Sequence, residues 1–374
     1  MKKVGIATFT GALPLNYGST LQTVALQKLI AEQGFNSCSC TLSNWIDKSR
    51  GHGLRRVINN TRRLGWKYLS TLIKFLLFFR KMKAHLSPHF SEFASKSEAA
   101  EYAKKHFDIL CVGSDAIWRK RWLKDFFLWD YPELKDKPVF SYAPSVNNGE
   151  ITYGNFGVVL DRYKAISVRE TPAKDYVQEH IAKDVQVVLD PTLAVDEELW
   201  HRASTGRLIK DNYILVYIIE RPDKYRITIE DVAKRYGSKI VYINTDFIDK
   251  SSIEYNLYHD DDYTGIVGPA QFLSLIKYSD AVVTDSFHGS CFSVVFRKDF
   301  YVIPRAILDL SKNDNRISDL TERLEIGDRY IKNNTQILKM PGIEWNITEK
   351  ALEKERMNSK YFIKMALDAC TERE

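Results

Sequence analysis

The sequence predicts an α/β protein built from two Rossmann-like domains, and three observations lead to this prediction. Short apolar runs of β-forming residues alternate with helical patterns along the chain, which is typical of parallel βαβ units. The alternation restarts after Leu193, and 374 residues are enough for two hydrophobic cores. The composition, with 44% hydrophobic and 27% charged residues, is that of a globular protein rather than a disordered one.

The predicted strands fall into two series. The first series comprises residues 4–9, 37–42, 108–112, 139–142, 165–168 and 185–189. The second comprises residues 213–219, 239–243, 281–284 and 300–303, and a final helix is expected at 348–369. We therefore predict an N-terminal domain over 1–195, with a basic helical segment at 48–91, and a C-terminal domain over 196–345. Residues 346–374 are expected to cross back and pack on the first domain.

The N-terminus and the cysteines predict a cytoplasmic protein. The short apolar run at residues 4–9 is followed by polar residues, so the pattern of a secretory signal is missing. The five cysteines include no CxxC pair, which argues against a disulfide framework and a zinc site. Metal-ligand spacing is also missing elsewhere, and the acidic run at 259–262 is expected to be a solvated loop, so no obligatory metal is predicted.

The net charge of +6 is concentrated in one segment. No acidic residue occurs between Asp47 and Glu92, whereas eleven lysines and arginines fall there. The apolar run at 69–79 is shorter than the roughly 20 residues that a membrane span needs. The segment either contacts an anionic membrane surface or a lipid-linked diphosphate, or packs its Leu/Phe side on the core and leaves its cations in water. The cations proposed for the membrane or diphosphate contact are Arg62, Arg63, Lys67, Arg80 and Lys81.

Ligands of parallel α/β sheets bind at the carboxyl ends of the strands, so the loops after the strands are the candidate sites. After residues 4–9, the loop with Asn16, Tyr17 and Gly18 leads into a helix, where Ser19 and Gln22 fit a capping box. Such a helix N-terminus suits a polar or anionic ligand. The loop lacks GxGxxG, so a dinucleotide fingerprint is missing, and its glycines can equally serve only to form turns.

Charged residues follow two further strands of the first series. Asp115 comes after the strand at 108–112, where it binds a ligand or only caps a helix. Arg169 and Glu170 follow the strand at 165–168. The Arg169 guanidinium can clamp a phosphate or carboxylate, or it pairs with Glu170 or another acid. The sequence leaves both readings open at each position.

The strand at 281–284 is followed by a histidine at the start of a helix. Asp285 or Ser286 is expected to cap this helix, and Gly289 lets a ligand approach the backbone closely. A helix N-terminus disfavours an imidazolium, so His288 gains its proton most easily when a bound anion offsets the helix dipole. The structural alternative is a histidine with satisfied bonds in an apolar neighbourhood.

Together these segments resemble the polysaccharide pyruvyl transferase family over most of the chain. Six segments carry the resemblance, in the order and at spacings similar to those of the family. They are NYGSTLQTVAL at 16–26, VGSDAIW at 112–118, SVRE at 167–170, VLDPTLAV at 188–195, TDSFHGSCFSVVF at 284–296 and NRISDLTERLEIGDRYI at 315–331. The resemblance is weakest from 45 to 105.

The resemblance implies a GT-B-like fold, with two domains facing a cleft, and a specific reaction. Family members transfer the three-carbon unit of phosphoenolpyruvate to a sugar as a cyclic ketal and release phosphate. Phosphoenolpyruvate is then a co-substrate and no other cofactor is implied. The implied acceptor is a sugar of a bacterial surface glycan, exopolysaccharide or capsule, carried on polyprenyl diphosphate at the inner membrane face. A cytoplasmic, peripherally membrane-bound enzyme without a nucleic-acid partner would fit this role.

The resemblance also implies roles for individual residues. His288 matches the family's motif histidine, a candidate proton donor or phosphate ligand. The donor site would comprise Arg169, Ser286, Phe287, His288, Gly289 and Arg316. The acceptor site would comprise Asn16, Tyr17, Gly18 and Asp115. Many relatives carry an arginine where this chain has Ser286, and Arg305, Lys312 or Arg316 can supply the missing cation.

Two other functions remain compatible with the sequence. The first is a GT-B glycosyltransferase that uses a nucleotide sugar, because a fold does not fix a function. The second is a non-catalytic, membrane-associated scaffold in which the basic segment is the working part. The substitution by Ser286 favours the scaffold, whereas histidine, arginine and asparagine in separate strand-end loops favour an enzyme.

Overall fold

A computed structural model describes most of the chain and divides it into two compact units. It describes residues 1–10, 16–42, 58, 66–82, 90–119, 123–146, 153–219, 225–243, 267–303, 315–331, 337 and 340–372. The first unit comprises Met1–Gly65, Phe79–Val195 and Glu353–Glu374. The second comprises Trp66–Phe78 and Asp196–Leu352.

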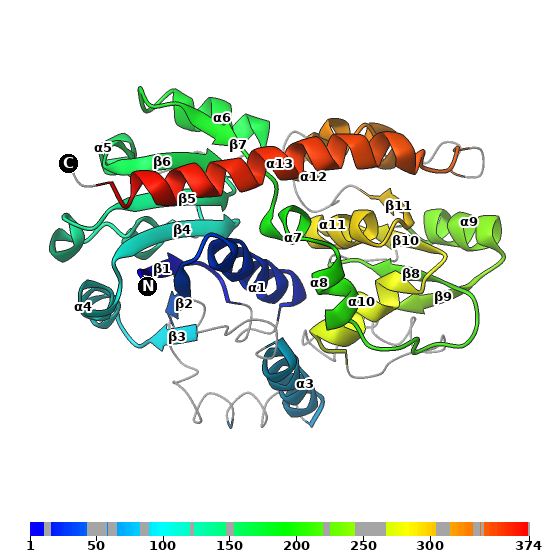
Figure 1. Cartoon of the computed structure of the whole chain (residues 1–374). Helices are drawn as coiled ribbons and strands as arrows, with labels where there is room; N and C mark the ends of the chain where they lie inside the picture. The colour runs from blue at the N-terminus through cyan, green and yellow to red at the C-terminus, as the bar shows by residue number, and fades with distance from the viewer. Residues whose placement is uncertain are drawn as a thin grey trace. The chain divides into compact units, whose positions relative to one another are not determined.

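The first unit contains a seven-stranded parallel sheet of order β3-β2-β1-β4-β5-β6-β7 (Figure 1). Its strands are β1 (Lys3–Ala7), β2 (Asn36–Leu42), β3 (Phe90–Phe93), β4 (Ile109–Asp115), β5 (Val139–Pro144), β6 (Tyr163–Val168) and β7 (Val185–Val187). Every residue of β4 and β5 is buried, as expected for central strands of a parallel sheet. Because β1 pairs with both β2 and β4, the strand order reverses between β1 and β4.

Helices cover both faces of this sheet. They are α1 (Tyr17–Glu32), α4 (Lys96–His106), α5 (Phe156–Asp161), α6 (Thr171–Gln178), α7 (Pro191–Ala194) and most of α13 (Trp345–Ala369). Two short 3₁₀ helices, Asp125–Leu128 and Pro132–Leu134, lie between β4 and β5. In Figure 1, α13 runs across β5, and the rings of its Phe362 and of Tyr142 lie 6.3 Å apart. The Ser359 hydroxyl of α13 also accepts a bond from the Leu189 N–H.

The second unit contains a four-stranded parallel sheet of order β11-β10-β8-β9. Its strands are β8 (Tyr213–Tyr217), β9 (Lys239–Tyr242), β10 (Ala281–Thr284) and β11 (Asp299–Val302). The order reverses here between β8 and β10. Its helices are α8 (Glu198–Ala203), α9 (Arg226–Tyr236), α10 (Pro269–Lys277), α11 (Phe287–Val295), α12 (Asn315–Arg323) and the 3₁₀ turn Gly327–Arg329.

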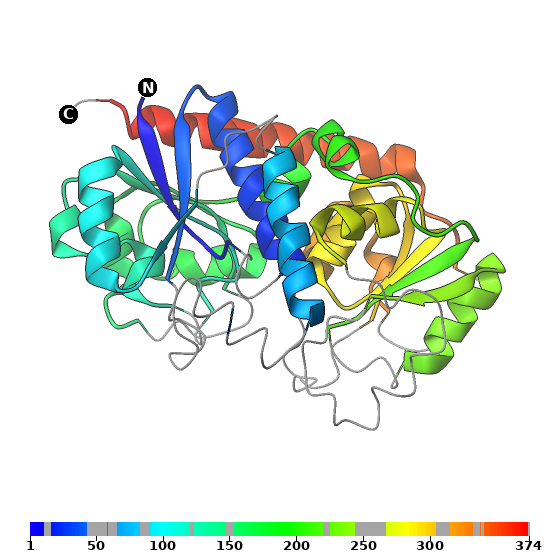
Figure 2. The same cartoon turned by 90° about the horizontal axis from the view of Figure 1, so that it is seen from below.

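The second core is built on the two faces of this sheet. Figure 2 shows α9 on one face and α10 and α11 on the other. On the α9 face, Val232 packs with strand residues such as Val216 and Val283. On the other side, the rings of Phe272 in α10 and Phe292 in α11 meet edge to face. The alternation of side chains along each strand therefore gives each face its own helical cover.

The α/β prediction is confirmed, because each of the ten predicted strands corresponds to a strand of one of two parallel sheets. Within the described residues, the prediction missed one strand, β3. β3 has only four residues, of which Phe93 alone is buried, so it carries no continuous apolar run.

The basic segment contains a helix, α3 (Trp66–Met82). Its residues up to Phe78 belong to the second unit, and the remaining residues belong to the first.

Candidate functional site

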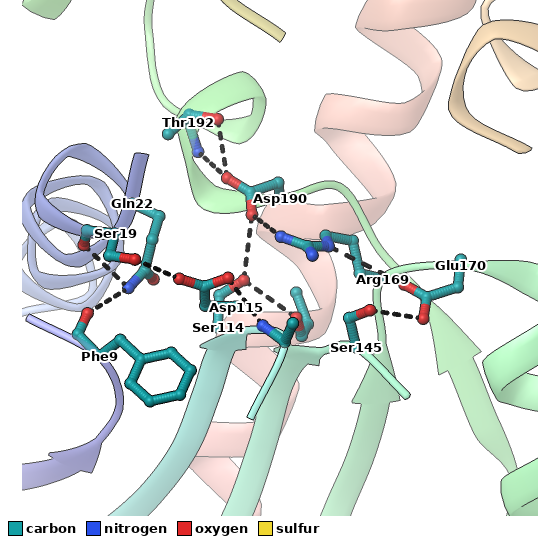
Figure 3. A network of polar contacts seen from close by, with 12 residues as sticks. Phe9, Ser19, Gln22, Ser114, Asp115, Ser145, Arg169, Glu170, Asp190 and Thr192 are labelled. Atoms are coloured by element: carbon teal, nitrogen blue, oxygen red, sulfur yellow. Dashed lines mark hydrogen bonds and ion pairs between the residues drawn. The ribbon is translucent and has the colours of Figure 1, made fainter. Parts of the chain in front are cut away.

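A hydrogen bond between Ser19 and Asp115 crosses the point where the strand order of the first sheet reverses. The Ser19 hydroxyl donates to Oδ2 of Asp115 at 2.6 Å, and the Ala116 N–H donates to Oδ1 at 2.7 Å (Figure 3). Ser19 lies in the first turn of α1, after β1, and Asp115 ends β4. Such reversal points are where open parallel sheets bind their ligands. Asp115 therefore presents a carboxylate at the expected place.

The local roles of the residues around α1 differ from the predicted capping box. Asn16 caps the helix, because its Oδ1 accepts a bond from the Ser19 N–H at 3.0 Å. The Ser19 hydroxyl is thereby left for Asp115, and the Gln22 amide donates inward to the Phe9 carbonyl at 2.9 Å. Asp115 is no helix cap either, since its backbone has a φ of 77° and β4 is followed by a turn.

A second set of bonds joins the ends of β4, β6 and β7. Arg169 Nη1 donates to Oδ2 of Asp190 at 2.8 Å, and the same oxygen accepts a bond from the Ser114 hydroxyl at 3.1 Å (Figure 3). The other Asp190 oxygen accepts bonds from the backbone and hydroxyl of Thr192 at the start of α7. The side chains of Arg169 and Asp190 are 1% and 0% exposed. Asp190 thus fixes the position of the guanidinium.

Glu170 completes this polar cluster on its far side. Its Oε1 accepts bonds from the Ser145 hydroxyl at 2.7 Å and from the Val146 N–H at 3.0 Å. Its other oxygen lies 3.9 Å from Arg169 Nε. We call these connected residues the strand-end cluster; they are Ser19, Ser114, Asp115, Ser145, Arg169, Glu170, Asp190 and Thr192.

The strand-end cluster contains more carboxylates than cations. The cluster as defined holds three carboxylates, those of Asp115, Glu170 and Asp190, and one guanidinium, that of Arg169, which lies close to Glu170 and Asp190. The negative charge of the cluster reaches Tyr142 in β5. Burial is the main cause that raises the pKa of this tyrosine, and the charge of Asp190 raises it further. Carboxylates accept bonds from hydroxyl groups, whereas they repel anions. The part of the cluster around Asp115 is therefore better suited to a sugar hydroxyl than to a phosphate.

The second candidate site lies where the strand order of the second sheet reverses. The Thr284 hydroxyl at the end of β10 donates to the Tyr217 carbonyl at 2.6 Å, and the Ile219 N–H donates to Asp285 at 2.7 Å. Both bonds join the ends of β8 and β10. Ser286, rather than Asp285, caps α11 and accepts a bond from the Gly289 N–H at 3.3 Å. The helix that carries the predicted histidine therefore begins directly at this reversal point.

The predicted donor residues of the second unit converge at the start of α11. The rings of Phe287 and His288 lie 5.4 Å apart at 88°, and His288 is half-buried. The guanidinium carbon of Arg316, in the first turn of α12, lies 5.9 Å from the centre of the Phe287 ring. A histidine, an arginine and a helix N-terminus therefore share one small region, which we call the α11 site and which comprises Ser286, Phe287, His288, Gly289 and Arg316.

The predicted residues are distributed as follows. Asn16, Tyr17 and Gly18 lie together at the start of α1, whose next residue, Ser19, contacts Asp115. Arg169 belongs to the first unit and the α11 site to the second, and the assignment of Arg169 to the donor stays a prediction. Arg62, Arg63, Arg305, Lys312 and the acidic run 259–262 lie outside the described residues. Lys67, Arg80 and Lys81 belong to α3.

Sequence reasoning missed two central members of the strand-end cluster. Asp190 directly follows a predicted strand and precedes Pro191, so its place at a strand end was a usable signal. Ser114 gave no signal of its own, because its partners Ala143 and Asp190 are 29 and 76 residues away. Such long-range bonds depend on the order of the strands rather than on local pattern.

A polar cavity of about 490 Å³ lies at the end of the second sheet where its strands begin, opposite to the strand ends that lead into the α11 site. Its lining includes Tyr236, Asp280, Lys298 and Trp345, near the starts of β10 and β11. Burial lowers the pKa of Lys298, which Asp280 partly counteracts. Since α11 begins after the end of β10, this cavity is separate from the α11 site.

The described residues include no group of three or more His, Cys, Asp or Glu side chains that could hold a metal ion. The five cysteines, all among the described residues, are buried free thiols.

Comparison with known proteins gives a family match and a fold match. A family model described as polysaccharide pyruvyl transferase matches residues 16–306. A UDP-GlcNAc 2-epimerase structure from Methanocaldococcus jannaschii has 13% identity and a TM-score of 0.52, covering 94% of this chain and 92% of its own. The search of curated proteins returned no match.

Two further structures resemble the chain at lower TM-scores. The UDP-GlcNAc 2-epimerase from Neisseria meningitidis, bound to UDP-GlcNAc, has 12% identity and a TM-score of 0.46, with 95% of this chain and 100% of that chain covered. The glycotransferase of kitacinnamycin has 10% identity and a TM-score of 0.48, with coverages of 98% and 97%. At these identities the structural likeness concerns the fold alone.

Proposed function

Because the chain belongs to the polysaccharide pyruvyl transferase family, we propose that it transfers the three-carbon unit of phosphoenolpyruvate to a sugar as a cyclic ketal. Inorganic phosphate is the second product, and phosphoenolpyruvate is a co-substrate with no further cofactor in this proposal. The proposed acceptor is a sugar of a bacterial exopolysaccharide or capsule, assembled on polyprenyl diphosphate.

The reaction needs one proton donor, one phosphate ligand and one group that accepts hydroxyl protons. Carbon 3 of the enol takes up a proton, which makes carbon 2 electrophilic. A sugar hydroxyl adds to carbon 2, the bond from carbon 2 to the phosphate oxygen breaks, and a second hydroxyl closes the ring. The two hydroxyls release two protons; one balances the proton taken up by carbon 3 and the other is taken up by the leaving phosphate. General acid–base catalysis of such steps typically contributes 10²–10⁴-fold in rate.

One observation carries the proposal. In this member of the family, His288 and Arg316 both lie beside Phe287 at the N-terminus of α11. A cation and a helix N-terminus both favour a bound anion such as the phosphate of phosphoenolpyruvate. In the proposed mechanism Arg316 binds this phosphate and His288 protonates carbon 3. A bound phosphate beside the helix N-terminus would in turn favour the protonated histidine.

Many relatives carry an arginine at the position of Ser286, and this chain needs another cation in its place. The contacts at the start of α11 favour Arg316 over Arg305 and Lys312 for this role. The Ser286 hydroxyl caps α11, a role that an arginine side chain cannot take because it has no acceptor. Arg316 reaches the neighbouring Phe287 ring from α12. We therefore assign to Arg316 the charge that the motif lacks. On the acceptor side, Asp115 is proposed to accept a proton from a sugar hydroxyl.

The experiment that tests the proposal combines a phosphate assay with analysis of the product. The purified protein is incubated with phosphoenolpyruvate and oligosaccharides prepared from bacterial exopolysaccharide after removal of existing ketals. The proposal predicts one released phosphate for each new ketal methyl group seen by NMR, and a deuterium atom in that methyl group when the solvent is D₂O. Sugar transfer from a nucleotide sugar without phosphoenolpyruvate would overturn it.

A further inference from the structure

Helix α3 exposes apolar side chains beside its cations. Trp66 is 79% exposed, and Ile73, Leu76 and Leu77 are 47–57% exposed. The opposite face is apolar as well and is buried, through Leu72, Phe75, Phe78 and Met82. Of the two alternatives, packing of a Leu/Phe side on the core is therefore met by one face of α3, but the exposed face carries apolar residues as well as cations. Single exposed apolar residues are normal, but a contiguous group on one helix marks an interaction surface.

The exposed residues form one stripe along the helix. Trp66, Ile73 and Leu77 are separated by seven and four residues, which places them above one another on a single face. Leu76 lies next to this line, and Arg80 follows it four residues later on the same side. The stripe therefore runs over more than three turns, from a tryptophan at one end to exposed cations at the other.

The charges that flank the stripe have one sign. α3 carries Lys67, Lys74, Arg80 and Lys81, and it contains no acidic residue. Arg80 and Lys81 are exposed, and Lys74 is half-buried beside the stripe. Burial lowers the pKa of Lys74 and of Lys81, as expected when the aliphatic stems lie against apolar surface. Long cationic side chains beside an apolar face can reach outward to phosphate groups.

We propose that α3 lies in the interface of an anionic membrane, with Trp66, Ile73, Leu76 and Leu77 inserted among the lipids and its cations at the headgroups. A helix of this type binds through buried apolar area together with attraction to anionic lipid. A protein partner fits the composition less well, because lysine is depleted from protein interfaces whereas basic residues beside an apolar stripe are typical of membrane-surface helices. No described helix is long and apolar enough to cross a membrane, so the contact is with one surface.

Vesicle flotation of the whole protein tests this proposal. The probe is a vesicle of phosphatidylcholine and phosphatidylglycerol, with phosphatidylcholine alone as reference. The double variant Ile73→Ser/Leu77→Ser should lower partitioning onto the anionic vesicles by roughly tenfold or more, at low and at high salt. Arg80→Gln/Lys81→Gln should lower it by roughly tenfold at low salt and much less at high salt, since salt screens these charges.

Exposed apolar residues elsewhere provide the matched control. Val158 in α5 and Ile227 in α9 are more exposed than Ile73 and Leu77, so Val158→Ser/Ile227→Ser removes a comparable amount of exposed apolar surface. This control should bind vesicles like the unaltered protein. Tryptophan fluorescence gives a second readout. Emission should shift to shorter wavelength when anionic vesicles are added, and the shift should disappear in Trp66→Phe.

Three results would overturn the proposal. They are no flotation with anionic vesicles, unchanged flotation of Ile73→Ser/Leu77→Ser, and an equal loss in the Val158→Ser/Ile227→Ser control. A change in oligomeric state in Ile73→Ser/Leu77→Ser, seen by light scattering without vesicles, would identify the stripe as a protein interface instead. The proposal does not depend on the enzymatic assignment, because vesicle flotation needs no activity. Pyruvyl transfer to a water-soluble acceptor should in turn be unaffected by the stripe variants, so the two proposals can fail separately.

Discussion

The hydroxyl of Ser19 donates to the carboxylate of Asp115 at 2.6 Å, across the reversal of strand order between β1 and β4. A comparable arrangement occurs in the second unit, where Thr284 donates to the Tyr217 carbonyl across the reversal between β10 and β8. In both units, polar side chains thus tie together the two loops between which parallel sheets bind ligands. The first arrangement presents a carboxylate, and the second presents the start of a helix near a histidine and an arginine.

Asp115→Asn should impair use of the acceptor without disturbing the donor. Asparagine tolerates the left-handed backbone at this position, its Oδ1 can accept the bond from the Ala116 N–H, and its Nδ2 can donate to the Ser19 hydroxyl, so the fold should be retained. It cannot take a proton from a sugar hydroxyl. We expect kcat/KM for the acceptor to fall about 10²-fold in steady-state kinetics, with the dissociation constant for phosphoenolpyruvate unchanged. Acceptor kinetics like those of the unaltered protein would contradict this role.

His288→Gln should abolish most of the turnover while the protein remains folded. Glutamine keeps a hydrogen-bonding side chain but cannot protonate carbon 3, so a fall in kcat of about 10²–10⁴-fold is expected. The phosphate assay measures kcat, and circular dichroism checks the fold. Near-normal kcat in this variant would exclude His288 as the proton donor. A raised KM for phosphoenolpyruvate with an unchanged kcat would assign it to donor binding alone.

Arg169→Met should destabilise the first unit strongly, because it leaves Asp190 buried without the guanidinium. Removing one partner of a buried ion pair typically costs about 3–5 kcal/mol in the free energy of unfolding. Arg202→Met is the matched control, since Arg202 and Glu198 also lie 2.8 Å apart but are 61% and 55% exposed. That change should cost less than about 1 kcal/mol. Equal losses in denaturant titrations would show that Asp190 does not depend on Arg169.

Gly289→Ala should displace the first turn of α11. A Cβ at this position would lie 2.5 Å from the Thr284 hydroxyl and 3.1 Å from the Tyr217 ring. We expect a loss of about 1–3 kcal/mol in unfolding free energy, together with weaker binding of phosphoenolpyruvate. Gly206→Ala, in the same unit, is the control because nothing lies within 4 Å of its added Cβ. If both variants unfold at the same temperature, the close packing at Gly289 has no energetic importance.

The sequence predicted the strands better than it predicted the contacts between strand ends. Central strands such as β4 and β10 are buried throughout, so they appear as continuous apolar runs that can be read locally. Ser19 was assigned to a capping box because its spacing from Gln22 is local. Its partner Asp115 is 96 residues away in the sequence, so no local sequence pattern predicts the bond between them. The sequence left open whether the basic segment contacts a membrane or packs on the core, because it shows the charges and the apolar run of α3 but not which apolar residues are exposed.

The central claim is that phosphoenolpyruvate is the donor and that the α11 site binds it. Thermal unfolding with increasing phosphoenolpyruvate tests this most directly, because a ligand of the native state stabilises by RT ln(1 + [L]/Kd) and no acceptor is needed. We predict a rise in Tm with phosphoenolpyruvate and none with UDP-N-acetylglucosamine. The rise should be strongly reduced in Arg316→Gln and retained in Arg226→Gln, an exposed arginine of the same unit. A rise with the nucleotide sugar alone, or a response to phosphoenolpyruvate that is unchanged in Arg316→Gln, would contradict the claim.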